Sequence, residues 1–90
     1  MKNEEYNDQE QKIIDIISPV FREVFEDPTL IITRDLSAQD VPSWDSLNHI
    51  TLVVELEQTT DTTFSVDELS KMITVGDLID SLKNKGLGTQ

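Results

Sequence analysis

Three consecutive residues, Asp45, Ser46 and Leu47, have types and a position that could support chemistry. They follow Trp44 and open an apolar run with helical spacing, so Ser46 would lie in the first turn of a helix. The free backbone N–H groups and the dipole at such a terminus favour an anion. A phosphorylated group on the Ser46 hydroxyl would therefore be stabilised there. Two alternatives need no chemistry: Ser46 could simply cap the helix, and so could Asp45.

The composition disfavours catalysis by the chain's own side chains. The sequence has no cysteine and one histidine, His49, which excludes thiolate metal sites, His-cluster metal sites and Cys–His catalytic pairs. His49 follows Ser46 by three residues, but a Ser–His pair also needs a third group and an oxyanion site. The helical wheel places His49 within the apolar arc, so we expect a partly buried histidine and no enzyme.

The charge of the chain is strongly acidic, −11 over 90 residues. No Lys or Arg occurs between Arg34 and Lys71, a stretch with eight acidic residues around Ser46. Such a face disfavours nucleic acid and attracts basic protein surfaces, or else simply keeps the protein solvated. The N-terminus lacks an apolar signal-peptide core, and no apolar run approaches the ~18 residues of a membrane span. We therefore expect a cytoplasmic protein without a membrane segment.

The first half of the chain predicts one helix and a long loop. Apolar residues spaced i, i+3, i+4 and i+7 from Ile13 onward indicate the helix. Pro19 interrupts the pattern, and either kinks the helix or begins a second piece capped by Ser18. The loop covers residues 28–43. Its apolar side chains are expected to anchor it on the core: Leu30, Ile31, Ile32, Leu36 and Val41.

The second half predicts three further helices, the first at about 46–59. The apolar residues of that helix cover roughly 220° of the wheel, more than the ~100° stripe of a simple surface helix. Part of this excess would be buried, and the rest would form an exposed apolar strip near Ser46. We expect Trp44 to anchor the preceding loop on the bundle. Two capping boxes then open a short helix after Ser65 and a last helix after Thr74.

These elements predict an all-α fold, a small bundle of three longer helices plus one short helix, with a long loop between the first two. The bundle would occupy residues 9–85 as one domain, between a frayed N-terminus at 1–8 and a C-terminal tail at 86–90. A chain this short buries about 60–65% of its unfolded surface, enough for a modest core but not for a deep enzyme cleft.

The chain resembles the acyl carrier protein family, which consists of phosphopantetheine-attachment domains. The resemblance runs from about Gln9 to Lys85 and rests on the order of helices together with three segments. These segments are Trp44-Asp45-Ser46-Leu47, Leu56-Glu57 and Thr74-Val75-Gly76-Asp77-Leu78. The resemblance implies an acyl-carrier-like bundle in which Ser46 accepts 4′-phosphopantetheine from coenzyme A through a phosphopantetheinyl transferase. Asp45 and Leu47 would lie beside the attached arm.

The resemblance also assigns roles to the faces of the second helix. Leu47, Val54 and Glu57 match positions that face partner enzymes. The residues that match the inner side, where a cargo chain can be sheltered, are Ile50, Leu52, Val53 and Leu56. The protein would then be a discrete, type II-like, monomeric carrier of acyl or aminoacyl thioesters. Its partners would be loading and transfer enzymes with basic docking surfaces.

Two departures from the carriers of fatty acid synthesis indicate a specialised biosynthetic pathway. Thr60 stands where those carriers usually have a Phe. The second helix is also less acidic than theirs, with other residues at Asn48, His49, Thr51 and Gln58. A close alternative is a peptidyl or D-alanyl carrier, which would use the same serine. The alternative from another class is an unmodified acidic helical adaptor, or a nucleic-acid mimic, that binds proteins through residues 35–70.

Overall fold

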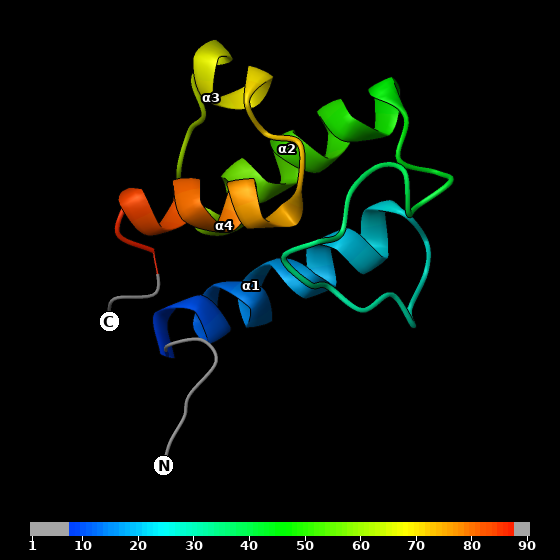
Figure 1. The fold of residues 1–90 in the computed structure, drawn as a ribbon, viewed down its shortest axis with the longest axis horizontal. Coiled ribbons are helices and arrows are strands. Elements are labelled where there is room, and N and C mark those ends of the chain that lie inside the picture. The colour runs from blue at the N-terminus through cyan, green and yellow to red at the C-terminus, as the bar shows by residue number, and fades with distance from the viewer. Residues whose placement is uncertain (1–7, 88–90) are drawn as a thin grey trace.

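The computed structural model describes residues 8–87, and this part of the chain is helical. It contains four α-helices: α1 (Asp8–Val24), α2 (Ser46–Thr60), α3 (Val66–Ser70) and α4 (Val75–Asn84). α1 packs against both α2 and α4, and α3 lies on the side of α4 away from α1 (Figure 1). The predicted all-α bundle of three longer helices and one short helix is confirmed. Residues 1–7 of the predicted frayed N-terminus lie outside the described residues.

α1 is one continuous helix with an apolar face. The fully buried residues of that face are Ile13, Ile17 and Phe21. Pro19 lies inside the helix on its exposed side. The Ser18 hydroxyl donates a 2.6 Å hydrogen bond to the carbonyl of Ile14, which is typical of a serine in a helix interior. The alternative in which Ser18 begins a second helical piece is therefore wrong.

The connection between α1 and α2 is held by the first turn of α4. The carbonyls of Arg34 and Leu36 accept 2.9 Å hydrogen bonds from the N–H groups of Gly76 and Val75. Both donors lie in the first helical turn, where the backbone N–H groups have no partner within the helix. A Cβ atom at Gly76 would lie 3.2 Å from the Arg34 carbonyl oxygen. Glycine at this position therefore permits the close approach of loop and helix.

Most of the predicted apolar anchors of this loop are in place. Ile32 and Val41 are buried, and Leu30 and Leu36 are partly buried against the core. Ile31 is 68% exposed, so its prediction as an anchor is wrong. Of the two adjacent residues Ile31 and Ile32, only Ile32 packs against the core.

Local capping fixes both ends of α4. The Thr74 hydroxyl accepts the Asp77 N–H at 3.3 Å, and the Asp77 carboxylate accepts the Thr74 N–H at 3.0 Å. Hydrogen bonds from backbone N–H groups, that of Thr74 foremost, lower the pKa of the Asp77 carboxyl. At the other end Gly86 has a φ of 90°, and the Leu87 N–H donates to the Leu82 carbonyl at 3.1 Å. Leu87, which we predicted within the tail, packs against the core.

α3 buries none of its residues fully and is attached to α4 by polar contacts. Ser65 and Glu68 form the predicted capping box. The Glu68 carboxylate also accepts hydrogen bonds from Ser81 Oγ and Lys85 Nζ, both at 3.0 Å. The bond from Lys85, followed by that from the Ser65 N–H, lowers the pKa of Glu68 to about 2. One carboxylate thus connects α3 to α4, and Leu69 of α3 packs against the core.

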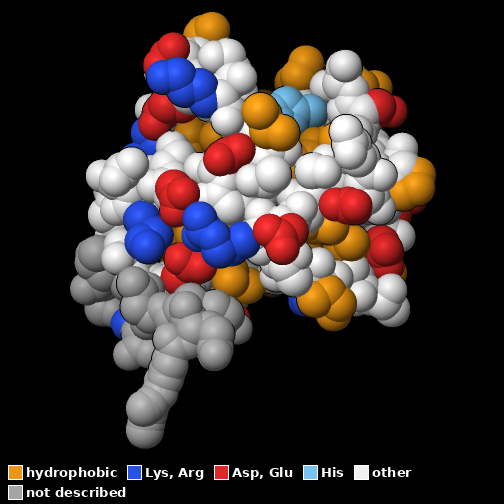
Figure 2. All heavy atoms as spheres, viewed as in Figure 1, with side chains coloured by type: hydrophobic (Ala, Val, Ile, Leu, Met, Phe, Trp, Pro, Cys, Tyr) orange, Lys and Arg blue, Asp and Glu red, His pale blue; other side chains and the backbone are white. Residues whose placement is uncertain are grey.

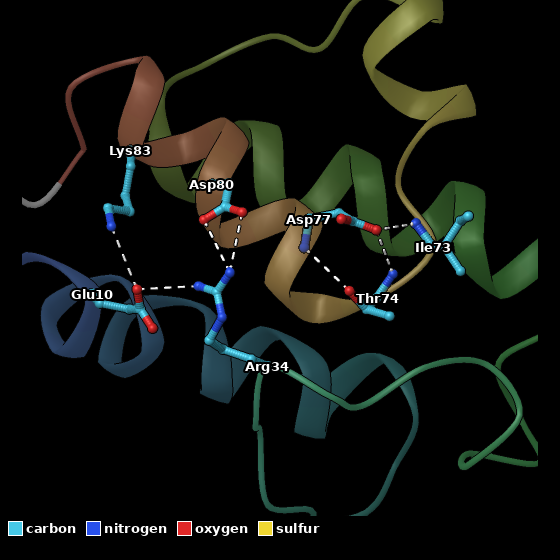
Figure 3. Close-up of polar contacts among 7 residues, drawn as sticks. All are labelled: Glu10, Arg34, Ile73, Thr74, Asp77, Asp80 and Lys83. Atoms are coloured by element: carbon cyan, nitrogen blue, oxygen red, sulfur yellow. Dashed lines mark hydrogen bonds and ion pairs between the residues drawn. The ribbon is translucent and has the colours of Figure 1, made fainter. Parts of the chain in front are cut away.

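A charged network joins α1, the long loop and α4 (Figure 3). Arg34 lies 3.1 Å from Glu10 and 3.1 Å from Asp80, and Lys83 lies 3.5 Å from Glu10. Glu10 is buried, with 7% of its surface exposed. A buried carboxylate is costly unless it is paired, so the two cations allow this acid to sit between three parts of the fold.

Replacing Arg34 with alanine is expected to lower the free energy of unfolding by about 1–2 kcal/mol, because Glu10 loses the guanidinium that lies 3.1 Å away. The value is below that of a fully buried ion pair because the Arg34 side chain is 42% exposed. Urea denaturation followed by circular dichroism measures the change. Lys71→Ala, which breaks an exposed pair with Asp67, is the control and should cost less than about 0.5 kcal/mol. Equal losses in the two variants would contradict a structural role for the network.

Candidate functional site

The start of α2 places Ser46 in the first helical position. Asp45 is the N-cap, with an extended backbone, and its Oδ1 accepts the Asn48 N–H at 2.9 Å. The Asp45 carbonyl accepts the His49 N–H at 2.8 Å. The Asn48 side chain donates to the Ser43 carbonyl at 2.7 Å and so fixes the end of the loop. The alternative in which Ser46 is the helix cap is therefore wrong, because Asp45 fills that position.

Ser46 is exposed, and its hydroxyl makes no hydrogen bond to another residue of the described chain. The N–H groups of Ser46 and Leu47 likewise have no acceptor within residues 8–87. Two unpaired donors and the positive end of the helix dipole therefore lie beside an accessible hydroxyl. This arrangement suits a phosphodiester on Ser46 Oγ, because the negative charge would meet free donors.

Trp44 anchors the loop before α2, as we predicted. Its ring packs edge-on against Phe21, with centroids 5.6 Å apart, and its centroid lies 5.4 Å from that of Phe25. The indole N–H donates to Nδ1 of His49 at 3.1 Å, and the two rings are stacked. An indole nitrogen is only a donor, so Nδ1 of His49 is an acceptor that is already in use. His49 is half-buried, as expected, and serves the loop anchor.

The apolar residues of α2 divide between the core and the solvent. Those buried in the core are Leu52, Val53 and Leu56, as predicted. Leu47 is 73% exposed and Val54 is 44% exposed. Ile50, predicted on the inner side, is 62% exposed, so that placement is wrong. The wheel could not reveal this, because its apolar arc is wider than the face that the rest of the bundle covers.

Glu57, a predicted docking residue, also has an internal contact. Its Oε2 accepts the N–H of Phe64 at 2.8 Å, and Phe64 is buried in the core. One oxygen of the carboxylate therefore orders the turn after α2. The other oxygen, Oε1, has no partner among the described residues.

An open groove of about 680 Å³ lies directly beside Ser46. Besides Trp44 and the start of α2, its lining residues are Ala38, His49, Ile50, Met72 and Ile73. Ile73 is 71% exposed, and hydrophobic side chains surround the histidine in the hollow between α2 and α3 (Figure 2). Sequence reasoning missed Ala38 and Ile73, since no local pattern marks them. They reach Ser46 only through the packing of the loop and of the segment after α3.

Two solved structures are similar to this chain in fold and in sequence. Holo acyl carrier protein from Geobacter metallireducens is similar over 80% of this chain and 83% of its own, with a TM-score of 0.76 and 43% identity. A candidate acyl carrier protein from Mycobacterium tuberculosis is similar over 79% of this chain and 95% of its own, with a TM-score of 0.70 and 25% identity. No protein-family model and no curated protein matches the chain. At 43% identity over four fifths of its length, the chain belongs to the acyl carrier protein family.

Two other kinds of feature are missing from the described part of the chain. None of its helices is both long enough and apolar enough to cross a membrane. Residues 8–87 also contain no group of three or more His, Asp or Glu side chains that could hold a metal ion.

Replacing Asp45 with alanine should lower the free energy of unfolding by about 1 kcal/mol, because the Asn48 N–H loses its capping acceptor. For a domain of this size the melting temperature should fall by about 4–8 °C. Thermal denaturation followed by circular dichroism gives the result. Asp45→Asn, whose side chain can still cap the helix, should stay within about 2 °C of the wild type. An alanine variant as stable as the wild type would show that the cap does not hold this end of α2.

Proposed function

We propose that this protein carries acyl or aminoacyl groups as thioesters on a 4′-phosphopantetheine arm at Ser46 and presents them to partner enzymes. The position of Ser46 carries the proposal: it is the first residue of α2, it is exposed, and its hydroxyl has no partner in the described chain. Membership of the acyl carrier protein family supports it. The similar protein from Geobacter metallireducens is a holo acyl carrier protein.

Attachment would join Ser46 Oγ to the phosphorus of the arm. A transferase would accept the hydroxyl proton as Oγ attacks coenzyme A, and adenosine 3′,5′-bisphosphate would leave with the electron pair of the broken P–O bond. The phosphodiester would lie beside the free N–H groups of Ser46 and Leu47. Asp45 would keep the helix terminus in place. The arm would also supply the thiol that this cysteine-free chain lacks.

Partner enzymes would dock on α2, close to the arm. Leu47 and Val54 provide exposed apolar contacts, and Glu57 Oε1 provides a free carboxylate oxygen. No Lys or Arg occurs between Arg34 and Lys71, so this region would attract basic surfaces. The chain itself would need no catalytic group, since tethering raises the concentration of the cargo at whichever enzyme is docked.

We further propose that the carrier is a cytoplasmic monomer of a specialised pathway. Thr60 supports the pathway assignment, because it is buried and its hydroxyl donates to the Leu56 carbonyl at 2.7 Å. A polar contact thus occupies the position at which carriers of fatty acid synthesis usually have a Phe. A peptidyl or D-alanyl carrier would use the same serine. Loading the holo protein with acyl and with aminoacyl donors separates these possibilities.

The attachment site is tested by intact mass spectrometry after incubation with coenzyme A, Mg²⁺ and a broad-specificity phosphopantetheinyl transferase. The wild type should gain the mass of one phosphopantetheine, and Ser46→Ala should gain none because the attacking oxygen is removed. Ser43→Ala is the matched control, since Ser43 is an exposed serine in the preceding turn, and it should be modified like the wild type.

Modification of Ser46→Ala would overturn the assignment of the attachment residue. A folded wild type that gains no mass with two different transferases would favour the acidic adaptor. In that case Ser46→Ala would still bind the partner protein of the adaptor, and charge reversal at Glu55 and Glu57 would abolish this binding.

The docking surface is tested by the kinetics of the same transferase reaction. Leu47→Ala and Val54→Ala should each raise the KM for the carrier about fivefold, as expected for the loss of about 1 kcal/mol of contact. Val66→Ala removes an apolar side chain that is 84% exposed on α3 and should leave KM unchanged. Equal KM values for all three variants would place the docking surface elsewhere.

A further inference from the structure

The interior of the bundle next to Ser46 is closed. A cavity of only about 10 Å³ remains there, lined among others by Leu52, Val53, Leu56 and Leu78. A void of this size is at the lower limit for a single water molecule and cannot hold an alkyl chain. The three buried α2 residues predicted to shelter cargo therefore face a filled core. The open volume beside Ser46 is the surface groove, of about 680 Å³.

The wall between the groove and this interior is made by Trp44, His49 and Met72, which line both spaces. The indole of Trp44 is fixed from two directions. Phe21 of α1 and Phe25, directly after α1, contact the ring, and its N–H donates to His49 of α2 at 3.1 Å. A ring held by aromatic packing and by a directional hydrogen bond is a more rigid wall than an aliphatic side chain.

The groove is accessible from the attachment point itself. Ser46 lies on its rim, so a group at the end of an arm on Ser46 would be tethered at high effective concentration. Ile50 and Ile73, both more than half exposed, provide apolar contact area in the groove. The Ile50 side chain thus lines the surface groove and does not contribute to the core.

We propose that Trp44, positioned by His49, excludes the cargo from the bundle interior, so that the thioester-linked group lies in the surface groove against Ile50 and Ile73. This inference rests on the carrier function proposed above. It narrows the cargo to acyl or aminoacyl groups of a few carbons, because a long alkyl chain would gain no core burial to offset its exposure to water. Trp44 is a specificity-determining residue in this scheme, and His49 is a positioning residue.

The test uses the full-length protein loaded through the transferase with ¹³C-labelled octanoyl-phosphopantetheine from octanoyl-coenzyme A. Mass spectrometry first establishes loading, so a failure of the carrier function would appear as an unmodified protein. Nuclear Overhauser contacts from the octanoyl chain to protein methyl groups are then measured. In the wild type we expect contacts to the Ile50 and Ile73 methyls and none to those of Leu52 and Leu56. Contacts to Leu52 and Leu56 in the wild type, or contacts to neither pair, would overturn the proposal.

Variants then test the role of Trp44. In Trp44→Ala, contacts to Leu52 and Leu56 should appear, and the octanoyl form should melt at least about 4 °C above the acetyl form because the chain is now buried. In the wild type the two forms should melt within about 1 °C of each other. Ile73→Ala, which removes groove wall but leaves the indole, is the matched control and should show no core contacts. A folded Trp44→Ala variant whose octanoyl group still makes no contact with Leu52 and Leu56 would show that Trp44 does not exclude the cargo. If that variant is unfolded, the wild-type contacts decide the proposal.

Discussion

The packing of the Trp44 indole against Phe21 and Phe25 determines where the long loop ends and α2 begins. The next residue, Asp45, caps the helix, and Ser46 follows as its first residue. The connection from α1 is long, and its internal hydrogen bonds join residues only two or three positions apart. The first turn of α4 holds the middle of this connection, and the aromatic contact of Trp44 holds its end, directly before the serine. The hydrogen bond from the indole to His49 connects the same anchor to the first turn of α2.

Three basic residues join separate parts of the fold around α4. Arg34 and Lys83 neutralise the buried Glu10, and Lys85 holds Glu68 and lies over the ring of Phe64. These contacts attach the loop and α3 to α4. The sequence around Ser46, by contrast, contains no Lys or Arg between Arg34 and Lys71. This distribution of charge stabilises the fold around α4 and, in the function proposed above, would attract basic surfaces to the region of Ser46.

The surroundings of Ser46 keep the hydroxyl free and the helix terminus fixed. Polar groups nearby are engaged with one another: Asp45 with the Asn48 N–H, the Asn48 side chain with the loop, and His49 with Trp44. The hydroxyl and the first two amides of the helix stay unpaired within the described chain. A site built in this way is suited to holding a group on a tether. In the function proposed above, the catalytic chemistry would belong to the enzymes that dock.

Much of the fold and the position of Ser46 could be predicted from the sequence, because they depend on interactions over three or four residues. The capping boxes at Ser65 and Thr74 and the apolar spacing of α1 are of this kind, and they marked the helices closely. The sequence also located Ser46 at a helix terminus, although it left open whether Ser46 or Asp45 is the cap.

The tertiary structure decided which apolar residues are covered and which polar groups are in use. Ile31, Ile50 and Ile73 are exposed, although their residue type favours burial. His49 accepts a hydrogen bond from the Trp44 indole, and one carboxylate oxygen of Glu57 accepts the Phe64 N–H in the turn after α2. These outcomes depend on where the long loop and the segments before and after α3 lie in the folded chain, which brings together residues that are distant in the sequence. Burial depends on the neighbours that cover a side chain, whereas a helix cap needs only the residues next to it.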